Sequence, residues 1–243
     1  RDSIRATDFH GKDGLGDSNL PLPELSVHKD SALDLIPETV SSFKKKELTI
    51  IATGPLTNIA AVLTKEPNVA DRIGELVVMG GAFGLTGYGY GNETPAAEFN
   101  IYSDPEAAKI VFESGVPLKA VGLDVTMFPG AHLTKRDYAR VKAGQTRVSS
   151  FASRILSKTM RKWGRFALHD PLAVAASVRP SLFQFERCNA LVETKGEHTT
   201  GMTLVDRRDW LPTSQRKGRD IMVSKSVRFQ SFKTLLLNRL LKS

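Results

Sequence analysis

The sequence predicts an α/β protein built on an open, mostly parallel sheet that is flanked by helices. Short apolar runs of strand length alternate with segments of helical periodicity, which is the pattern of parallel strands joined by helical crossovers. The chain has 243 residues, of which 41% are hydrophobic and 25% charged. This size and composition fit one large globular domain, so we expect residues 1–243 to form a single domain.

The first strands follow from three apolar runs, the first two of which end at a turn signal. Leu48–Ala52 ends at Thr53-Gly-Pro55, and Leu76–Met79 ends at the Gly80-Gly81 pair. Glycine lacks a Cβ, so this pair permits a tight turn or a close approach of the backbone to a ligand. Pro117–Val125 is predicted as the third strand, and further strands are expected between residues 188 and 204.

The helices are predicted from capping signals and from apolar periodicity. The clearest helix spans 104–114, with Asp104 as N-cap, Pro105 in the first turn and Gly115 as its stop. The same reasoning predicts helices at 57–65, 134–143, 149–163, 172–178 and 229–241.

Composition excludes some classes of protein. No run approaches the roughly 18 apolar residues of a membrane span. The only cysteine, Cys188, cannot form an internal disulfide, which favours a reducing compartment, and we expect a cytoplasmic protein. The sequence begins with Arg1 and its first ten residues lack the apolar core of a signal peptide, so we expect that the true amino terminus precedes it.

Charge is unevenly distributed along the chain. Residues 1–125 hold 11 basic and 18 acidic residues, whereas residues 126–243 hold 23 basic and 8 acidic residues, and together they give the net charge of +8. Such asymmetry raises the hypothesis of an anionic partner. The basic residues between Lys135 and Arg165 alternate with apolar positions and contain no aromatic RNA-binding motif. We therefore predict a solvated basic face and no nucleic-acid partner.

Ligands of open α/β sheets bind where loops leave the carboxyl ends of the strands. Thr53, Met79-Gly80-Gly81 and Asp124-Val-Thr126 are all predicted at such ends and should share one rim. The glycine-rich loop that follows carries Asn92, Glu98 and Asn100. If residues 98–100 are extended, Glu98 and Asn100 face the same way and form a hydroxyl-recognition pair. The alternative is a polar loop that is held by its own hydrogen bonds.

His169 and Asp170 also have two interpretations. Asp170 precedes Pro171 and can be the N-cap of a helix, while His169 can be a packed or surface residue. Both can equally belong to a reaction centre, and the local sequence does not distinguish these roles.

Six segments together resemble the inosine–uridine-preferring nucleoside hydrolase family, whose fold is Rossmann-like. Their order and spacing match over nearly the whole chain, starting from His10-Gly-Lys-Asp-Gly-Leu-Gly16. The segments are Ala52-Thr-Gly-Pro-Leu-Thr-Asn-Ile-Ala60, Val77-Val-Met-Gly-Gly-Ala82, Gly91-Asn-Glu-Thr-Pro-Ala-Ala-Glu-Phe-Asn100, Asp104-Pro-Glu-Ala-Ala108, Gly122-Leu-Asp-Val-Thr126 and His169-Asp-Pro-Leu-Ala173.

The resemblance implies a Ca²⁺ cofactor, a ribonucleoside substrate, a role in purine and pyrimidine salvage, and a homo-oligomer, either a dimer or a tetramer. It implies that the Thr53 carbonyl and the Asp170 carboxylate bind the metal, and that Asp170 also contacts the ribose. All-oxygen ligation is what Ca²⁺ prefers.

The remaining roles are also carried over from the family. Asn100 would contact the lower ribose hydroxyls, and Asn92 and Glu98 would hold the 5′-hydroxyl. Met79 would line the ribose pocket with Phe99 behind it. His169 would lie near the departing base as the catalytic proton donor, with His10 in the same region.

The chemistry explains these residue types. Breaking an N-glycosidic bond builds positive charge on the sugar, which carboxylates and amides around the ribose can stabilise. A bound Ca²⁺ lowers the pKa of a water, so that a nearby carboxylate can take its proton.

The sequence departs from the family at one motif. The pattern Asp-x-Asp-x-x-x-Asp-Asp, which supplies most of the calcium ligands and the general base, does not occur in these 243 residues. We therefore expect that the amino-terminal strands of the sheet are missing. The sequence is then a fragment of an active enzyme, a non-catalytic homologue that binds nucleosides or nucleic acid, or a chain completed by another polypeptide.

Overall fold

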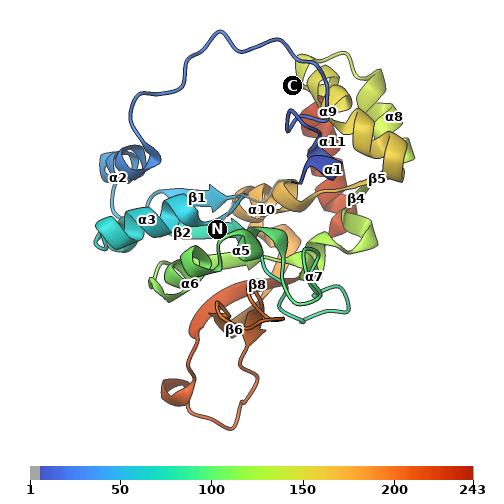
Figure 1. The fold of residues 1–243 in the computed structure, drawn as a ribbon. Helices are drawn as coiled ribbons and strands as arrows, with labels where there is room; N and C mark the ends of the chain where they lie inside the picture. Colours follow the sequence, from blue (N-terminus) through green and yellow to red (C-terminus); the bar gives the residue numbers. More distant parts are fainter. Residues whose placement is uncertain (1–5, 243) are drawn as a thin grey trace. The chain divides into compact units, whose positions relative to one another are not determined.

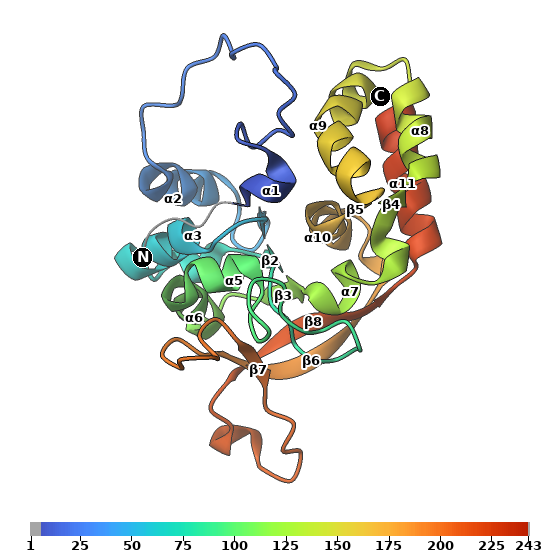
Figure 2. The ribbon, with the colours of Figure 1, turned by 45° about the vertical axis from the view of Figure 1, so that its right-hand side comes forward.

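The computed structural model describes residues 6–242, and their contacts divide into two compact units within the span predicted as a single domain. Unit 1 comprises residues 1–27, 129–168 and 228–243, and unit 2 comprises residues 28–128 and 169–227. Figures 1 and 2 show the ribbon from two directions.

A six-stranded sheet forms the centre of unit 2, in the order β1-β2-β3-β8-β6-β7. The first four strands in this order are parallel, and β6 and β7 are antiparallel to their neighbours. Figure 2 shows the long β6 and β8 running side by side. The predicted mostly parallel α/β sheet is therefore confirmed. The strands are β1 (Thr49–Ala52), β2 (Glu75–Met79), β3 (Leu118–Val121), β6 (Phe183–Val192), β7 (Thr203–Val205) and β8 (Arg219–Val227).

Helices cover both faces of this sheet. One face packs against α2, α3, α4 and α6 through alternate strand residues such as Leu76, Val78 and Ala120, which belong to the main hydrophobic core. The intervening Val77 and Met79 are also buried but lie outside that cluster, and α10 packs against β1, β2 and β3. These helices are α2 (Ala32–Ser42), α3 (Thr57–Lys65), α4 (Val69–Arg72), α6 (Pro105–Glu113) and α10 (His169–Val178).

The strand predicted over Pro117–Val125 is too long. β3 ends at Val121, and Leu123–Thr126 forms one turn of helix, α7. All four residues of α7 are buried. A short apolar run does not distinguish a buried strand from a buried helical turn, so the sequence pattern continued through Gly122 although the backbone changes there.

Two further predictions need correction. Residues 98–100 are not extended, because Glu98 is the N-cap of the short helix α5 (Phe99–Ser103). Asp170 is not an N-cap, because α10 already begins at His169 and Asp170 falls in its first turn. The strand β8 was not predicted, because its apolar residues are interrupted by Ser224 and Lys225. The 3-10 turns of unit 2 are η2 (Pro180–Leu182) and η3 (Thr213–Gln215).

Unit 1 is largely helical. Its two-stranded antiparallel sheet pairs β4 with β5, and α8 packs against α9. The predicted helices at 134–143, 149–163 and 229–241 are confirmed within two residues. The elements are α1 (Thr7–His10), η1 (Pro129–Ala131), β4 (His132–Thr134), α8 (Lys135–Ala143), α9 (Arg147–Trp163), β5 (Arg165–Ala167) and α11 (Phe229–Lys242).

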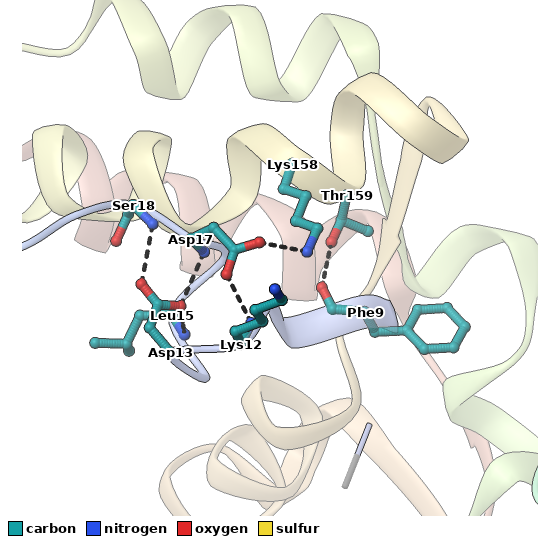
Figure 3. A network of polar contacts seen from close by, with 8 residues as sticks. All are labelled: Phe9, Lys12, Asp13, Leu15, Asp17, Ser18, Lys158 and Thr159. Carbon is teal, nitrogen blue, oxygen red and sulfur yellow. Dashed lines mark hydrogen bonds and ion pairs between the residues drawn. The ribbon is translucent and has the colours of Figure 1, made fainter. Parts of the chain in front are cut away.

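A polar network fixes the segment after α1 to α9 (Figure 3). Asp13 accepts hydrogen bonds from three backbone N–H groups, those of Leu15, Asp17 and Ser18. Asp17 forms an ion pair with Lys158, while the hydroxyl of Thr159 donates to the carbonyl of Phe9. The glycine-rich segment is therefore ordered by its contacts with one helix.

Every helix in the described residues 6–242 is too short or too polar to cross a lipid bilayer.

Candidate active site

The parallel register aligns the carboxyl ends of β1, β2 and β3 at one edge of the unit 2 sheet. Ala52 pairs with Val78, and Met79 pairs with Val121. The predicted rim therefore exists, and the backbone links its parts because the N–H of Leu123 donates to the carbonyl of Gly81 at 2.8 Å.

Gly81 is a position on this rim where only glycine fits. Its φ is +88°, and an added Cβ would lie 2.6 Å from the ring of Phe83. Its N–H donates to Glu98 Oε2 at 3.1 Å, and the same oxygen accepts from the N–H of Ile101 at 3.1 Å. One carboxylate thus holds the turn after β2 against the start of α5.

Glu98 is an ionisable group in an almost closed environment, with 2% of its surface exposed. Burial raises the pKa of this carboxyl, backbone N–H groups act in the opposite direction, and the nearby charge of Asp170 raises the pKa further. Asp170 lies in the first turn of α10. Asp170 itself is exposed.

Asn92 in the loop and Asn100 in α5 each use one end of the side-chain amide to hold the protein. Asn92 Oδ1 accepts from the N–H of Phe99 at 2.9 Å, and Asn100 Nδ2 donates to the carbonyl of Met79 at 3.0 Å. Among the described residues, no hydrogen bond engages Asn92 Nδ2 or Asn100 Oδ1. One amide donor and one amide acceptor therefore remain for a ligand.

His169 lies at the same edge of the sheet. Its Nδ1 is 2.8 Å from the hydroxyl oxygen of Thr126, the last residue of α7. The ring is half-buried, whereas the side chain of Thr126 is fully buried.

The other predicted site residues differ in their surroundings. Thr53 is exposed directly after β1, Met79 is buried at the end of β2, and Phe99 is half-buried in α5. All three belong to unit 2. His10 is an exposed residue at the end of α1 in unit 1.

The described residues do not fit a complete calcium site. Residues 6–242 contain no group of three or more His, Cys, Asp or Glu side chains arranged to hold a metal ion. Thr53 and Asp170 offer a carbonyl and a carboxylate, whereas Ca²⁺ takes about six to eight oxygens.

The predictions above assigned no role to Asp124. Its buried carboxylate accepts hydrogen bonds from the N–H groups of Phe83, Leu85 and Thr86 at 2.8, 2.6 and 3.3 Å. It therefore holds the loop after β2 against α7. A buried acid at a predicted strand end was the available signal, but its partners lie about 40 residues earlier in the sequence and local patterns do not reveal them.

A sequence model described as inosine-uridine preferring nucleoside hydrolase matches residues 1–234. The chain belongs to this family. The match extends across both units and includes all the candidate site residues named above, His10 included. The predicted resemblance is therefore confirmed.

Relatives of known name agree with this assignment. The chain is 39% identical to the pyrimidine-specific ribonucleoside hydrolase RihA of Escherichia coli, over 99% of this chain and 76% of the relative. Among solved structures, the plant nucleoside hydrolase PpNRh1 matches with a TM-score of 0.87 and 31% identity, over 99% of this chain and 76% of that one. The purine-preferring ribonucleoside hydrolase of Gardnerella vaginalis matches with a TM-score of 0.83 and 32% identity, over 97% and 73%.

This nucleoside hydrolase thus spans about three quarters of the length of these three relatives. All three carry the name of an enzyme that hydrolyses nucleosides, and the family is enzymatic. The names of the Escherichia coli and Gardnerella vaginalis relatives state different preferred bases, so family membership alone does not assign one.

Proposed function

We propose that this chain carries the sugar-binding part of a ribonucleoside hydrolase, which splits the N-glycosidic bond to give ribose and free base. Two observations together support this most directly: the chain belongs to a family of nucleoside hydrolases, and its polar candidate residues lie around one edge of the sheet. These residues are Asn92, Glu98, Asn100, His169 and Asp170. Each belongs to a segment that matches the family.

The free amide atoms suit the ribose. Asn92 Nδ2 can donate to a hydroxyl oxygen and Asn100 Oδ1 can accept from a hydroxyl hydrogen. We assign Asn92 to the 5′-hydroxyl and Asn100 to the lower hydroxyls. Met79 and Phe99 provide apolar surface, and Glu98 keeps this loop in place while its exposed neighbour Asp170 faces the sugar.

Charge explains the reaction. Cleavage builds positive charge on the sugar and negative charge on the departing base. Asp170 stabilises the former through its carboxylate, and His169 stabilises the latter by donating an N–H to the base. His10 is assigned to the same region of the substrate.

For calcium and its activated water, the proposal names only the residues that would bind the ion. Thr53 and Asp170 would contribute oxygens to Ca²⁺, and the other oxygens would have to come from carboxylates that residues 6–242 do not group with them. Calorimetric titration with Ca²⁺ measures this directly. We expect the 243-residue chain to bind Ca²⁺ weakly. Tight binding would contradict the inference that this chain lacks most of the calcium ligands.

The decisive assay follows free base released from uridine, cytidine and inosine in the presence of Ca²⁺. Pyrimidine nucleosides come first because the Escherichia coli relative is named pyrimidine-specific. The 243-residue chain is compared with a form that includes any coding sequence preceding Arg1. Release of base by the longer form is expected, and silence from both forms with all three substrates would refute hydrolysis.

A second candidate is a non-catalytic binding protein, favoured by the incomplete metal site and by the basic residues of unit 1. Residues 129–168 hold ten basic residues and one acidic residue. Titrations with uridine and with single-stranded RNA separate the two candidates. RNA binding weakens steeply with salt, because counterions are released, while nucleoside binding does not.

We further propose a cytoplasmic homo-oligomer. Cys188 is buried, and burial raises the pKa of its thiol to about 11, so it stays protonated and unreactive at neutral pH. Sedimentation velocity measures the oligomeric state, and a monomer at every concentration would contradict this part of the proposal.

A further inference from the structure

Thr126 is the residue that contacts the imidazole of His169 from α7. Its hydroxyl oxygen lies 2.8 Å from His169 Nδ1, and the threonine has no exposed surface. Both partners belong to unit 2, where α7 packs against α10. The contact therefore lies inside one compact unit.

The position of Thr126 is fixed by its own helix turn. Its N–H donates to the carbonyl of Gly122, and the N–H of Leu123 donates to the carbonyl of Gly81. In the same turn, the carboxylate of Asp124 accepts from the loop after β2. The Thr126 hydroxyl is therefore held in place and would not move with the His169 ring if that ring rotated.

The direction of the hydrogen bond follows from the burial of the threonine. A neutral imidazole has one donor and one acceptor nitrogen, and a hydroxyl can play either part. In residues 6–242, the Thr126 hydroxyl has no second hydrogen-bond partner. If it accepted from an Nδ1–H, its own buried O–H would stay unpaired, which is costly. The hydroxyl therefore donates to Nδ1.

We propose that Thr126 is a positioning residue that holds His169 in the tautomer with the proton on Nε2. The buried hydroxyl occupies Nδ1 and fixes the plane of the ring, so Nε2–H becomes the donor. This inference rests on the proposed function for its meaning in catalysis, because that donor is then the one offered to the departing base.

The tautomer can be measured without any turnover. Two-bond ¹H–¹⁵N correlation spectra of the ring nitrogens are recorded at a pH about two units above the ordinary histidine pKa of about 6.5. The chain has five histidines, and His169→Gln identifies the signals of His169. We expect a pyrrole-type Nε2 and a pyridine-type Nδ1 in the unmodified chain.

Three variants test the cause. Thr126→Val keeps the shape and removes the hydroxyl, so both ring shifts should move toward the averaged values of a water-exposed histidine. Thr126→Ser should retain the original pattern. Thr64→Val removes a hydroxyl that donates to the carbonyl of Ala60 in α3, and serves as the matched control without effect. A pyrrole-type Nδ1 in the unmodified chain, or unchanged shifts in Thr126→Val, would overturn the proposal.

Kinetics of an active form supply the second readout. Thr126→Val should lower kcat roughly 10- to 100-fold and leave KM nearly unchanged, because a misplaced donor affects the transition state more than binding. In a His169→Gln background the same substitution should have no further effect. Equal losses in both backgrounds would show a purely structural role. If no form hydrolyses nucleosides, the proposed function fails while the spectra still decide the tautomer.

Discussion

At the scale of single residues, the candidate site uses side chains that hold the protein and bind a ligand at the same time. Asn92 and Asn100 each form a hydrogen bond to the backbone with one group of the side-chain amide, and the other group remains available for a ligand. Fixing an amide by one hydrogen bond orients its second group before a ligand arrives, which lowers the entropic cost of binding. The two interpretations of this segment, a polar loop held by its own hydrogen bonds and a ligand-binding loop, are therefore compatible.

Asp170 is the residue whose loss should affect turnover most. In an active form, we expect Asp170→Ala to lower kcat/KM by roughly 100-fold or more, because it removes a ribose contact and a proposed metal oxygen together. Steady-state kinetics with uridine measure the effect. Near-normal activity would remove Asp170 from the site, provided that circular dichroism shows an unchanged fold.

Glu98 should make stability depend on pH. Its folded-state pKa lies above the ordinary value of 4.5, so its contribution to stability is complete below that value and is lost as the pH rises through the folded pKa. Glu98→Gln does not titrate. The difference in unfolding free energy between the unmodified chain and Glu98→Gln should therefore shrink as the pH rises above about 4.5.

Urea unfolding over a pH series measures this difference. Parallel profiles for the two proteins would show that the Glu98 carboxyl ionises in the folded state as easily as in the unfolded one.

At the scale of elements, α9 is more than a solvated basic face. Arg154 donates to the carbonyls of Ser18 and Asn19, and Lys158 pairs with Asp17, while Arg161 is exposed. The predicted solvated face thus describes Arg161, whereas Lys158 is partly exposed and in addition pairs with Asp17. A helix of mixed apolar and basic residues does not reveal by its pattern which basic side chains meet an acidic partner from a distant segment.

Removing Lys158 should loosen the segment that follows α1. We expect Lys158→Ala to speed cleavage by chymotrypsin after Leu15, because Asp17 loses its cationic partner and the segment keeps fewer contacts with α9, among them those of Arg154. Arg161→Ala is the matched control and should leave the cleavage rate unchanged. Equal rates in Lys158→Ala and the unmodified chain would mean that the ion pair does not order this segment.

At the scale of the whole molecule, the two units differ in their chemistry. Unit 2 holds the mixed sheet and nearly all candidate site residues, whereas unit 1 concentrates positive charge on helices. Unit 1 also contains a histidine, His132, with only 7% exposure and an Nε2 that has no hydrogen-bond partner. Lys233 from α11, Arg165 from β5 and Asp137 from α8 are the charged groups around it.

Unit 1 should therefore lose stability in mild acid. Burial, Arg165 and Lys233 lower the pKa of His132. Its contribution to stability is complete above the unfolded pKa of 6.5 and is lost as the pH falls through the lower folded value. Amide hydrogen exchange is measured at about pH 7.5 and about pH 5.5 and corrected for the intrinsic exchange rate. The amides of unit 1 should be less protected at the lower of these two pH values.

His132→Gln serves as the control for this experiment, because glutamine does not titrate and should flatten the pH dependence of unit 1. Unit 2 provides an internal reference. An equal loss of protection in both units, or an unaltered loss in the variant, would assign the effect to other groups.

The fold class, most helices, the family and the shared rim of the strand ends could all be predicted from the sequence. These properties follow from local signals, namely apolar periodicity, helix caps and motif order, which a single chain displays directly. Three features became visible only in the folded chain: Glu98 is a buried anchor, Asp124 holds the loop after β2, and Thr126 contacts His169. Each of these depends on partners that are distant in the sequence, and such contacts exist only once the sheet has brought the strand ends together.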